Sequence, residues 1–336
     1  MQGTRTELDP VLQAVAAAVS GSGLPPMVEL GPEGARERIR AALQSCAPGP
    51  EVAAVTAHRV GEHVGVRLYR PVARRSVGTI VHLHGGGWVT GDLDYADATC
   101  RMLADEAGAD VVSVDYRLAP EDPFPAATED AMAVLHWVAA GSEGLAGPVV
   151  VTGDSAGGNL AAVCALLSRD EDGIDLAGQV LIYPVVDADL GRDSYVQNSG
   201  VFLGSREMQW FLDHYCPDLE TRTSSLVSPL RAADLSGLPR TVVVVGGHDP
   251  LLDEGVEYAE RLRASGVPVE LLQFPSLAHG FLQFTGVSPA AAEAAQTIVR
   301  AAAVLLENID AKKNSTTGGV RACSGDPRRV RRGRNR

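Results

Sequence analysis

A serine, an aspartate and a histidine each follow a separate strand-like run, in the chain order Ser155, Asp249 and His279. A serine hydroxyl is a poor nucleophile at neutral pH unless a base takes its proton, and that base needs an acid to orient it. Together the three residue types can attack an acyl carbon, and this chain order is typical of one class of serine hydrolases. We predict Ser155 as the nucleophile, His279 as the base and Asp249 as the acid.

The segment around the serine reads "VVVTGDSAGGNLAAVCALL" and predicts a sharp turn between a strand and a helix. The β-branched run Val149–Thr152 is typical of a buried strand, and the alanine-rich part has apolar residues at helical spacing. Gly153 and Gly157 allow close backbone contacts, so Ser155 is expected at the tip of the turn. The alternative is an ordinary helix start capped by Asp154 or by the serine itself.

The sequence "HGGGW" at 84–88 directly follows the strand-like run 78–83 and contains three consecutive glycines, Gly85–Gly87, before Trp88. Acyl transfer forms an oxyanion, and backbone N–H groups must point toward it. A glycine run lets the backbone curl inward without side chains in the way, although a flexible loop is the alternative. The Ala156 N–H, just after the predicted nucleophile, would complete the oxyanion hole.

Other titratable residues near these strand ends compete for the same roles. His248 directly precedes Asp249 and would point away from it along a strand. Asp253 and Glu254 come one helical turn later and are expected to cap or solvate that helix. His82 lies within a strand-like run and is interpreted as structural.

The elements that must position these residues alternate along most of the chain. Strand-like runs lie at 55–60, 63–69, 78–83, 110–115, 148–152, 178–183, 240–246 and 267–274. Helical patterns lie at 94–107, 125–140, 155–169, 250–265 and 289–307. This alternation predicts an α/β fold with a mostly parallel sheet covered by helices on both faces. The first two strands are close enough to form an antiparallel hairpin at one edge.

Two segments depart from the alternation. Residues 1–50 are helical in pattern with proline breaks, and residues 186–225 are mixed. The large apolar side chains of the second segment fit either a core or a cap over the sheet.

Length and composition exclude several classes of protein. The chain has 336 residues, of which 45% are hydrophobic, enough for a substantial core. We find no apolar run of the roughly 18–20 residues that a membrane span needs, and we expect no signal peptide. Five widely spaced cysteines show no metal-ligand spacing, so we predict no metal site and a reducing, cytoplasmic location.

The charge is unevenly distributed along the chain. The formal net charge is −13, but residues 311–336 carry two lysines and seven arginines against one aspartate. An acidic body argues against nucleic-acid binding, and the tail has no aromatic residues for base stacking. We predict a disordered basic tail over 311–336 and no nucleic-acid partner.

Five motifs in order resemble those of the hormone-sensitive-lipase-like group of α/β-hydrolases, the bacterial family IV esterases. They are "HGGGW" at 84–88, "DYRLAPEDPFPA" at 115–126, "GDSAGGN" at 153–159, "DPLLDEG" at 249–255 and "HGF" at 279–281. The resemblance runs from about residue 50 to 308. It implies an eight-stranded, mostly parallel sheet with a helical cap. The implied domains are N-terminal cap helices at 1–50, a core at 51–185 and 226–310, and a cap insertion at 186–225.

The resemblance also implies a role for each motif residue. The implied catalytic residues are Ser155, Asp249 and His279, and the implied oxyanion donors are Gly86, Gly87 and Ala156. His84 and residues 115–121 would support the site structurally. The residues expected at the substrate pocket are Trp88, Phe202, Leu203 and Phe211.

The predicted function is hydrolysis of short- to medium-chain carboxylic esters through an acyl-serine, with no cofactor. One alternative is a biosynthetic hydrolase or cyclase that uses the same triad on an acyl thioester, a lactone or an acetylated natural product. A non-catalytic ligand receptor is a third hypothesis, because fold alone does not determine function. The expected partner is a small ester, and a homodimer is left open.

Overall fold

An eight-stranded sheet forms the centre of the computed structural model, which describes residues 6–43, 46–73, 76–170 and 173–317. The strands lie in the order β1-β2-β4-β3-β5-β6-β7-β8. Their bounds are β1 Ala54–Val60, β2 Val64–Arg70, β3 Thr79–Leu83, β4 Asp110–Asp115, β5 Val149–Asp154, β6 Leu176–Ile182, β7 Arg240–His248 and β8 Val269–Ala278. The predicted α/β class is confirmed.

Strand direction follows from the connections. β1 and β2 form an antiparallel hairpin at one edge, as predicted, and β2 also pairs antiparallel with β4. The remaining pairs, from β4 through β3 to β8, are parallel. Parallel neighbours need long crossovers, which the helices supply. The carboxyl ends of the parallel strands therefore meet at one edge of the sheet.

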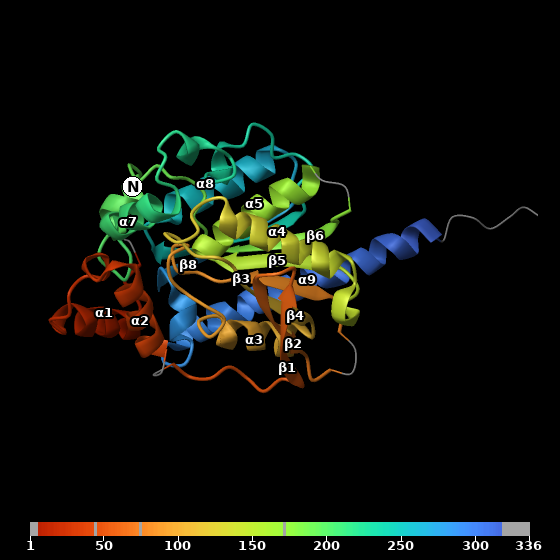
Figure 1. The fold of residues 1–336 in the computed structure, drawn as a ribbon, viewed down its shortest axis with the longest axis horizontal. Helices are drawn as coiled ribbons and strands as arrows, with labels where there is room; N and C mark the ends of the chain where they lie inside the picture. The colour runs from red at the N-terminus through yellow and green to blue at the C-terminus, as the bar shows by residue number, and fades with distance from the viewer. Residues whose placement is uncertain (1–5, 44–45, 74–75, 171–172, 318–336) are drawn as a thin grey trace, which may run out of the picture.

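Helices cover both faces of the sheet, and each face has its own hydrophobic core (Figure 1). One core is built against α4, α5 and α8, and the other against α3 and α9. The helix bounds are α3 Asp97–Ala107, α4 Ala126–Ala139, α5 Ala156–Asp170, α8 Leu252–Ala264 and α9 Pro289–Thr317. Burial on both faces explains why the central strands read as continuous runs of apolar residues.

The two segments that departed from the alternation lie together at one end of the sheet (Figure 1). The first contains α1 Pro10–Gly21, η1 Met27–Glu29 and α2 Gly31–Leu43, and the second contains α6 Asp193–Asn198 and α7 Ser205–Tyr215. α7 contacts η1, and Arg206 forms an ion pair of 3.2 Å with Glu29. Phe211 of α7 lies against Gly87, just beyond β3, so these helices adjoin the carboxyl ends of the strands.

Short 3₁₀ turns complete the described elements. They are η2 Ser142–Gly144, η3 Thr221–Thr223, η4 Pro229–Arg231 and η5 Phe281–Phe284. The last helix is longer than predicted, since α9 continues to Thr317. Of the predicted basic tail at 311–336, residues 318–336 lie outside the described residues.

Candidate active site

The side chains of Ser155, Asp249 and His279 meet beyond the carboxyl ends of their strands. His279 Nδ1 lies 2.8 Å from Asp249 Oδ2, and His279 Nε2 lies 2.9 Å from Ser155 Oγ. A carboxylate only accepts hydrogen bonds, so Nδ1 carries the proton and Nε2 accepts from the serine. This is the protonation state that a general base needs.

Each of these three side chains is largely removed from solvent. Ser155 is 8% exposed, His279 9% and Asp249 1%. Asp249 also accepts a hydrogen bond from the Leu251 N–H at 2.8 Å, which holds its second oxygen. The carboxylate is therefore oriented by two donors.

The serine lies on a strained turn between β5 and α5. Its φ is +56°, in the left-handed region that costs energy for any residue with a side chain. Its N–H donates to Ile182 O at 2.9 Å, which ties the turn to the end of β6. A β-carbon added at Gly157 would overlap the Leu83 carbonyl oxygen, and one at Gly153 would overlap the Gly157 carbonyl. The two glycines thus let β3, β5 and α5 approach closely.

We expect Gly157→Ala to lower the free energy of unfolding by about 1–3 kcal/mol or more, since about 1–3 kcal/mol is the usual cost of overpacking. The added methyl meets backbone atoms, which cannot move away as a flexible side chain can. Thermal unfolding followed by circular dichroism measures the effect. The matched control is Gly21→Ala at the end of α1, where an added β-carbon meets nothing within 4 Å. Equal melting temperatures for both variants would refute the close-approach argument.

The glycine loop after β3 has a backbone conformation that favours glycine. Gly86 and Gly87 have φ of +115° and +61°, values that a residue with a side chain adopts only with strain. The Gly86 carbonyl accepts from Thr90 N at 2.9 Å and from Thr90 Oγ1 at 2.8 Å, so its orientation is fixed. Ala156 is the first residue of α5, where an N–H has no partner within the helix. The structure therefore combines a glycine loop of positive φ with a helix start just after the serine.

Asp154, the residue before the serine, connects the turn to the glycine loop. Its Oδ1 accepts from Gly85 N at 2.9 Å, and the hydroxyl of Tyr95 lies 3.4 Å from Oδ2. Burial raises the pKa of this carboxyl to about 6, and the bond from Gly85 N opposes that rise. Asp154 is thus a support that links the two loops, rather than a helix cap.

His84, the residue before the glycine loop, is held in place by Tyr116. Its ring stacks on Tyr116 at 4.2 Å, and the Tyr116 hydroxyl donates to His84 O at 2.7 Å. Burial lowers the pKa of His84 to about 4, so the ring is neutral at physiological pH.

The four predicted pocket residues occupy different positions. Trp88 has no exposed surface and stacks on Tyr215 at 4.2 Å, so its ring packs beneath the loop rather than facing open space. Leu203 is also buried, at 7% exposure. Phe211 lies against Gly87, and Phe202 lines an apolar cavity elsewhere.

The competing residues are placed apart from the base. His248 Nε2 lies 2.9 Å from Thr6 O, on the other side of its strand. Asp253 Oδ2 accepts from Ser194 N at 2.8 Å. The expectation that Glu254 caps or solvates its helix is wrong, because the side chain is 0% exposed and its oxygens bond to another segment. The charge of a glutamate gives no signal of such burial, which depends on what packs over the helix.

No metal site accompanies these residues. The described part of the chain holds no group of three or more histidine, cysteine, aspartate or glutamate side chains arranged to bind a metal ion. In the described ranges, no helix combines the length and apolar character required to cross a bilayer.

Comparison with known proteins gives the family of this chain. Residues 80–283 match the model of the alpha/beta hydrolase fold family. The chain is 45% identical over 239 residues to the carboxylesterase NlhH of Mycobacterium tuberculosis, covering 69% of this chain and 75% of that protein. It is 34% identical over 308 residues to an ethyl acetate hydrolase of Pseudomonas putida, covering 88% and 97%.

Solved structures agree with the sequence relatives. A thermostable esterase from Pseudomonas putida superposes with a TM-score of 0.85 at 32% identity, covering 91% of this chain and 99% of that chain. An esterase from Pyrobaculum calidifontis superposes with a TM-score of 0.82 at 36% identity, covering 89% and 99%. With matches of this extent, the chain belongs to the α/β-hydrolase family, in its hormone-sensitive-lipase-like group of carboxylic ester hydrolases.

Proposed function

We propose that Ser155, His279 and Asp249 hydrolyse small carboxylic esters through an acyl-serine intermediate. Ser155 Oγ attacks the ester carbonyl carbon while His279 Nε2 takes its proton. The imidazolium then protonates the departing alkoxide, and the alcohol leaves. A water molecule attacks the acyl-serine by the same route in reverse, which releases the acid and returns the proton to Ser155.

The oxyanion formed at each tetrahedral stage would accept hydrogen bonds from the N–H groups of Gly86, Gly87 and Ala156. Support comes from the positive φ of the two glycines and from the place of Ala156 at the start of α5. Loss of one oxyanion donor costs roughly 2.7–4 kcal/mol of transition-state stabilisation in serine hydrolases. Asp154 would hold the glycine loop in register with the serine through Gly85 N.

The observation that carries this proposal is the pair of hydrogen bonds on His279, at 2.8 Å to Asp249 and 2.9 Å to Ser155. The presence and alignment of all three residues argue against the ligand-receptor alternative. The direct test is a series of p-nitrophenyl esters of increasing acyl length, run with and without prior treatment with a fluorophosphonate. We expect hydrolysis of the short esters, complete inhibition by the reagent, and one labelled site at Ser155.

We further propose that residues 1–50 and 186–225 form a cap that limits the substrate. A cavity of about 710 Å³ lies between α1, α2 and η5, and Phe202 is one of its walls. Phe202 stacks on Phe284 at 4.8 Å, five residues beyond the base His279. Tyr95, whose hydroxyl faces Asp154 beside the nucleophile, also lines the cavity. These two wall residues, Phe284 and Tyr95, lie near the triad and support the cavity as the place of the apolar part of the ester.

Phe202→Ala is expected to raise the ratio of kcat/KM for longer acyl chains over that for short ones by several-fold. A methylene in an apolar pocket is worth roughly 1–3 kcal/mol, so removal of one wall shifts the preferred length visibly. Val196→Ala on α6 is the control, because Val196 is 82% exposed. Parallel chain-length profiles for wild type and Phe202→Ala would mean that the pocket wall lies elsewhere, with Phe211 beside Gly87 as the next candidate.

The remaining aspects of the proposal concern partner and compartment. The net charge of −13 supports a small ester rather than a nucleic acid as the partner. In the described part of the chain, the thiols of Cys46, Cys100 and Cys216 are not in disulfide bonds, which supports a reducing, cytoplasmic location.

A further inference from the structure

One segment contacts all three residues of the proposed triad. It comprises residues 183–198, from the end of β6 to the end of α6, and is called the strap below. The ring of Tyr183 packs edge-on against His279 at 4.9 Å. Val185 N donates to Ser155 O at 3.3 Å, and Asn198 Nδ2 donates to Asp249 O at 2.8 Å. The strap thus lies between the serine turn and the aspartate loop.

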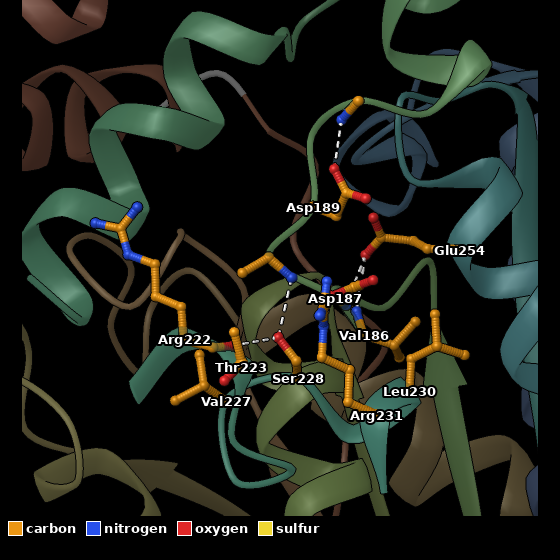
Figure 2. Close-up of polar contacts among 12 residues, drawn as sticks. Val186, Asp187, Asp189, Arg222, Thr223, Val227, Ser228, Leu230, Arg231 and Glu254 are labelled. Atoms are coloured by element: carbon orange, nitrogen blue, oxygen red, sulfur yellow. Dashed lines mark hydrogen bonds and ion pairs between the residues drawn. The ribbon is translucent and has the colours of Figure 1, made fainter. Parts of the chain in front are cut away.

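Glu254 joins the strap to the helix that follows the aspartate. Its Oε1 lies 2.8 Å from Val186 N and 3.4 Å from Asp187 N (Figure 2). The Tyr195 hydroxyl lies 3.3 Å from Oε2. The side chain is 0% exposed. Val186 directly follows Val185, whose N–H bonds to the serine. One peptide unit therefore separates the contact to Ser155 from the contact to α8.

The opposite side of the strap is held independently of Glu254. Val186 O accepts from Leu230 N at 2.9 Å, and Ala188 N donates to Ser228 Oγ at 3.0 Å (Figure 2). Arg231 Nε bonds to Asp187 Oδ1 at 2.6 Å. These contacts all go to the turn before β7, not to α8. The far end of the strap has its own bonds to α8, because Ser194 N donates to Asp253 Oδ2 at 2.8 Å. Loss of Glu254 would therefore leave the strap folded, but its first residues, next to the serine turn, would lose their bond to α8.

We propose that Glu254 is a positioning residue, which sets the spacing between the serine turn and the aspartate loop by fixing the first residues of the strap to α8. The inference rests on the proposed roles of Ser155, Asp249 and His279. Burying a carboxyl group costs free energy unless hydrogen bonds replace those it made with water. The side chain of Glu254 is 0% exposed, so its hydrogen-bond partners must offset that cost. The partners it has are backbone N–H groups of the strap, which makes alignment the function that this geometry serves.

The proposed role of Glu254 needs an oxygen that accepts a hydrogen bond from Val186 N, and does not need a negative charge. Burial raises the pKa of Glu254 to about 8, so a neutral side chain is compatible with this position near neutral pH. A glutamine amide offers the same acceptor to Val186 N at nearly the same size. Leucine fills the space but cannot accept a hydrogen bond. Aspartate is one methylene shorter, so its carboxyl group lies further from Val186 N.

The experiment compares Glu254→Leu, Glu254→Asp and Glu254→Gln, with Glu260→Gln as an exposed control on the same helix. The concentration of reactive serine is titrated with a fluorophosphonate, and kcat is expressed per labelled site. We expect Glu254→Leu to lose on the order of tenfold or more in kcat, since misplacement by 1 Å can cost about a hundredfold. KM should stay within about twofold, because the substrate pocket is not touched.

The conservative variants separate positioning from folding. Glu254→Gln should keep kcat within about threefold of wild type, and Glu254→Asp should fall between Gln and Leu. A merely structural role would lower the labelled fraction and leave kcat per labelled site unchanged, and that outcome would overturn the inference. If Glu254→Leu does not fold, Glu254→Asp becomes the test. A wild-type kcat per labelled site in Glu254→Asp would then overturn the inference. A failure of the proposed function would give a different result, because the wild-type protein itself would then show no ester hydrolysis and no labelling of Ser155.

Discussion

Ser155→Ala is expected to remove ester hydrolysis almost completely, with a fall in kcat on the order of 10⁶-fold. The hydroxyl is the only group that can form the acyl intermediate at this position, and His279 Nε2 would be left without its partner at 2.9 Å. The assay is hydrolysis of a short p-nitrophenyl ester, together with covalent labelling by a fluorophosphonate, which should also disappear.

The fold of this variant is expected to survive. Ser155 is held by its backbone, through the N–H bond to Ile182 O and the carbonyl bond from Val185 N, and alanine keeps both. The exposed Ser236→Ala is the matched control and should keep full activity. Near-wild-type turnover by a purified, folded Ser155→Ala protein would end the assignment of the nucleophile.

His279→Ala and Asp249→Asn form the second large prediction. Without the base, kcat should fall nearly as far as without the serine, because residues that act as a unit do not contribute additively. Asp249→Asn should cost about 10⁴-fold, since an amide favours the wrong imidazole tautomer while it keeps the geometry. The measurement is kcat on the same ester after active-site titration.

Asp253→Asn is the matched control for the acid, four residues further along the chain. Its carboxylate accepts from Ser194 N at 2.8 Å and does not contact His279, so we expect only a small loss of activity. If Asp253→Asn lost activity while Asp249→Asn kept it, Asp253 would be the acid. The hydrogen bond of 2.8 Å between Asp249 and His279 would then not be required for catalysis.

Much of the architecture could be predicted because its signals are local. Strand-like runs of apolar and β-branched residues predicted all eight strands, and the ends of four of the parallel strands, β3, β5, β7 and β8, placed the candidate site residues at a shared edge. The antiparallel hairpin of β1 and β2 followed from the short connection between them, and the pairing confirms it. The roles of the site residues stay predictions, but their order along the chain was sufficient to name them.

The sequence by itself determined which residue types reach the edge of the sheet, because glycine turns, strand periodicity and chain order are properties of neighbouring residues. Only the tertiary structure decided how far apart they lie and what surrounds them. Trp88 was expected at the pocket, yet its ring is buried on Tyr215 from a helix more than a hundred residues away. Glu254 was expected in solvent, yet it bonds to Val186 N. Burial and hydrogen bonding of such side chains depend on segments distant in sequence, and no local pattern records which segment will pack over them.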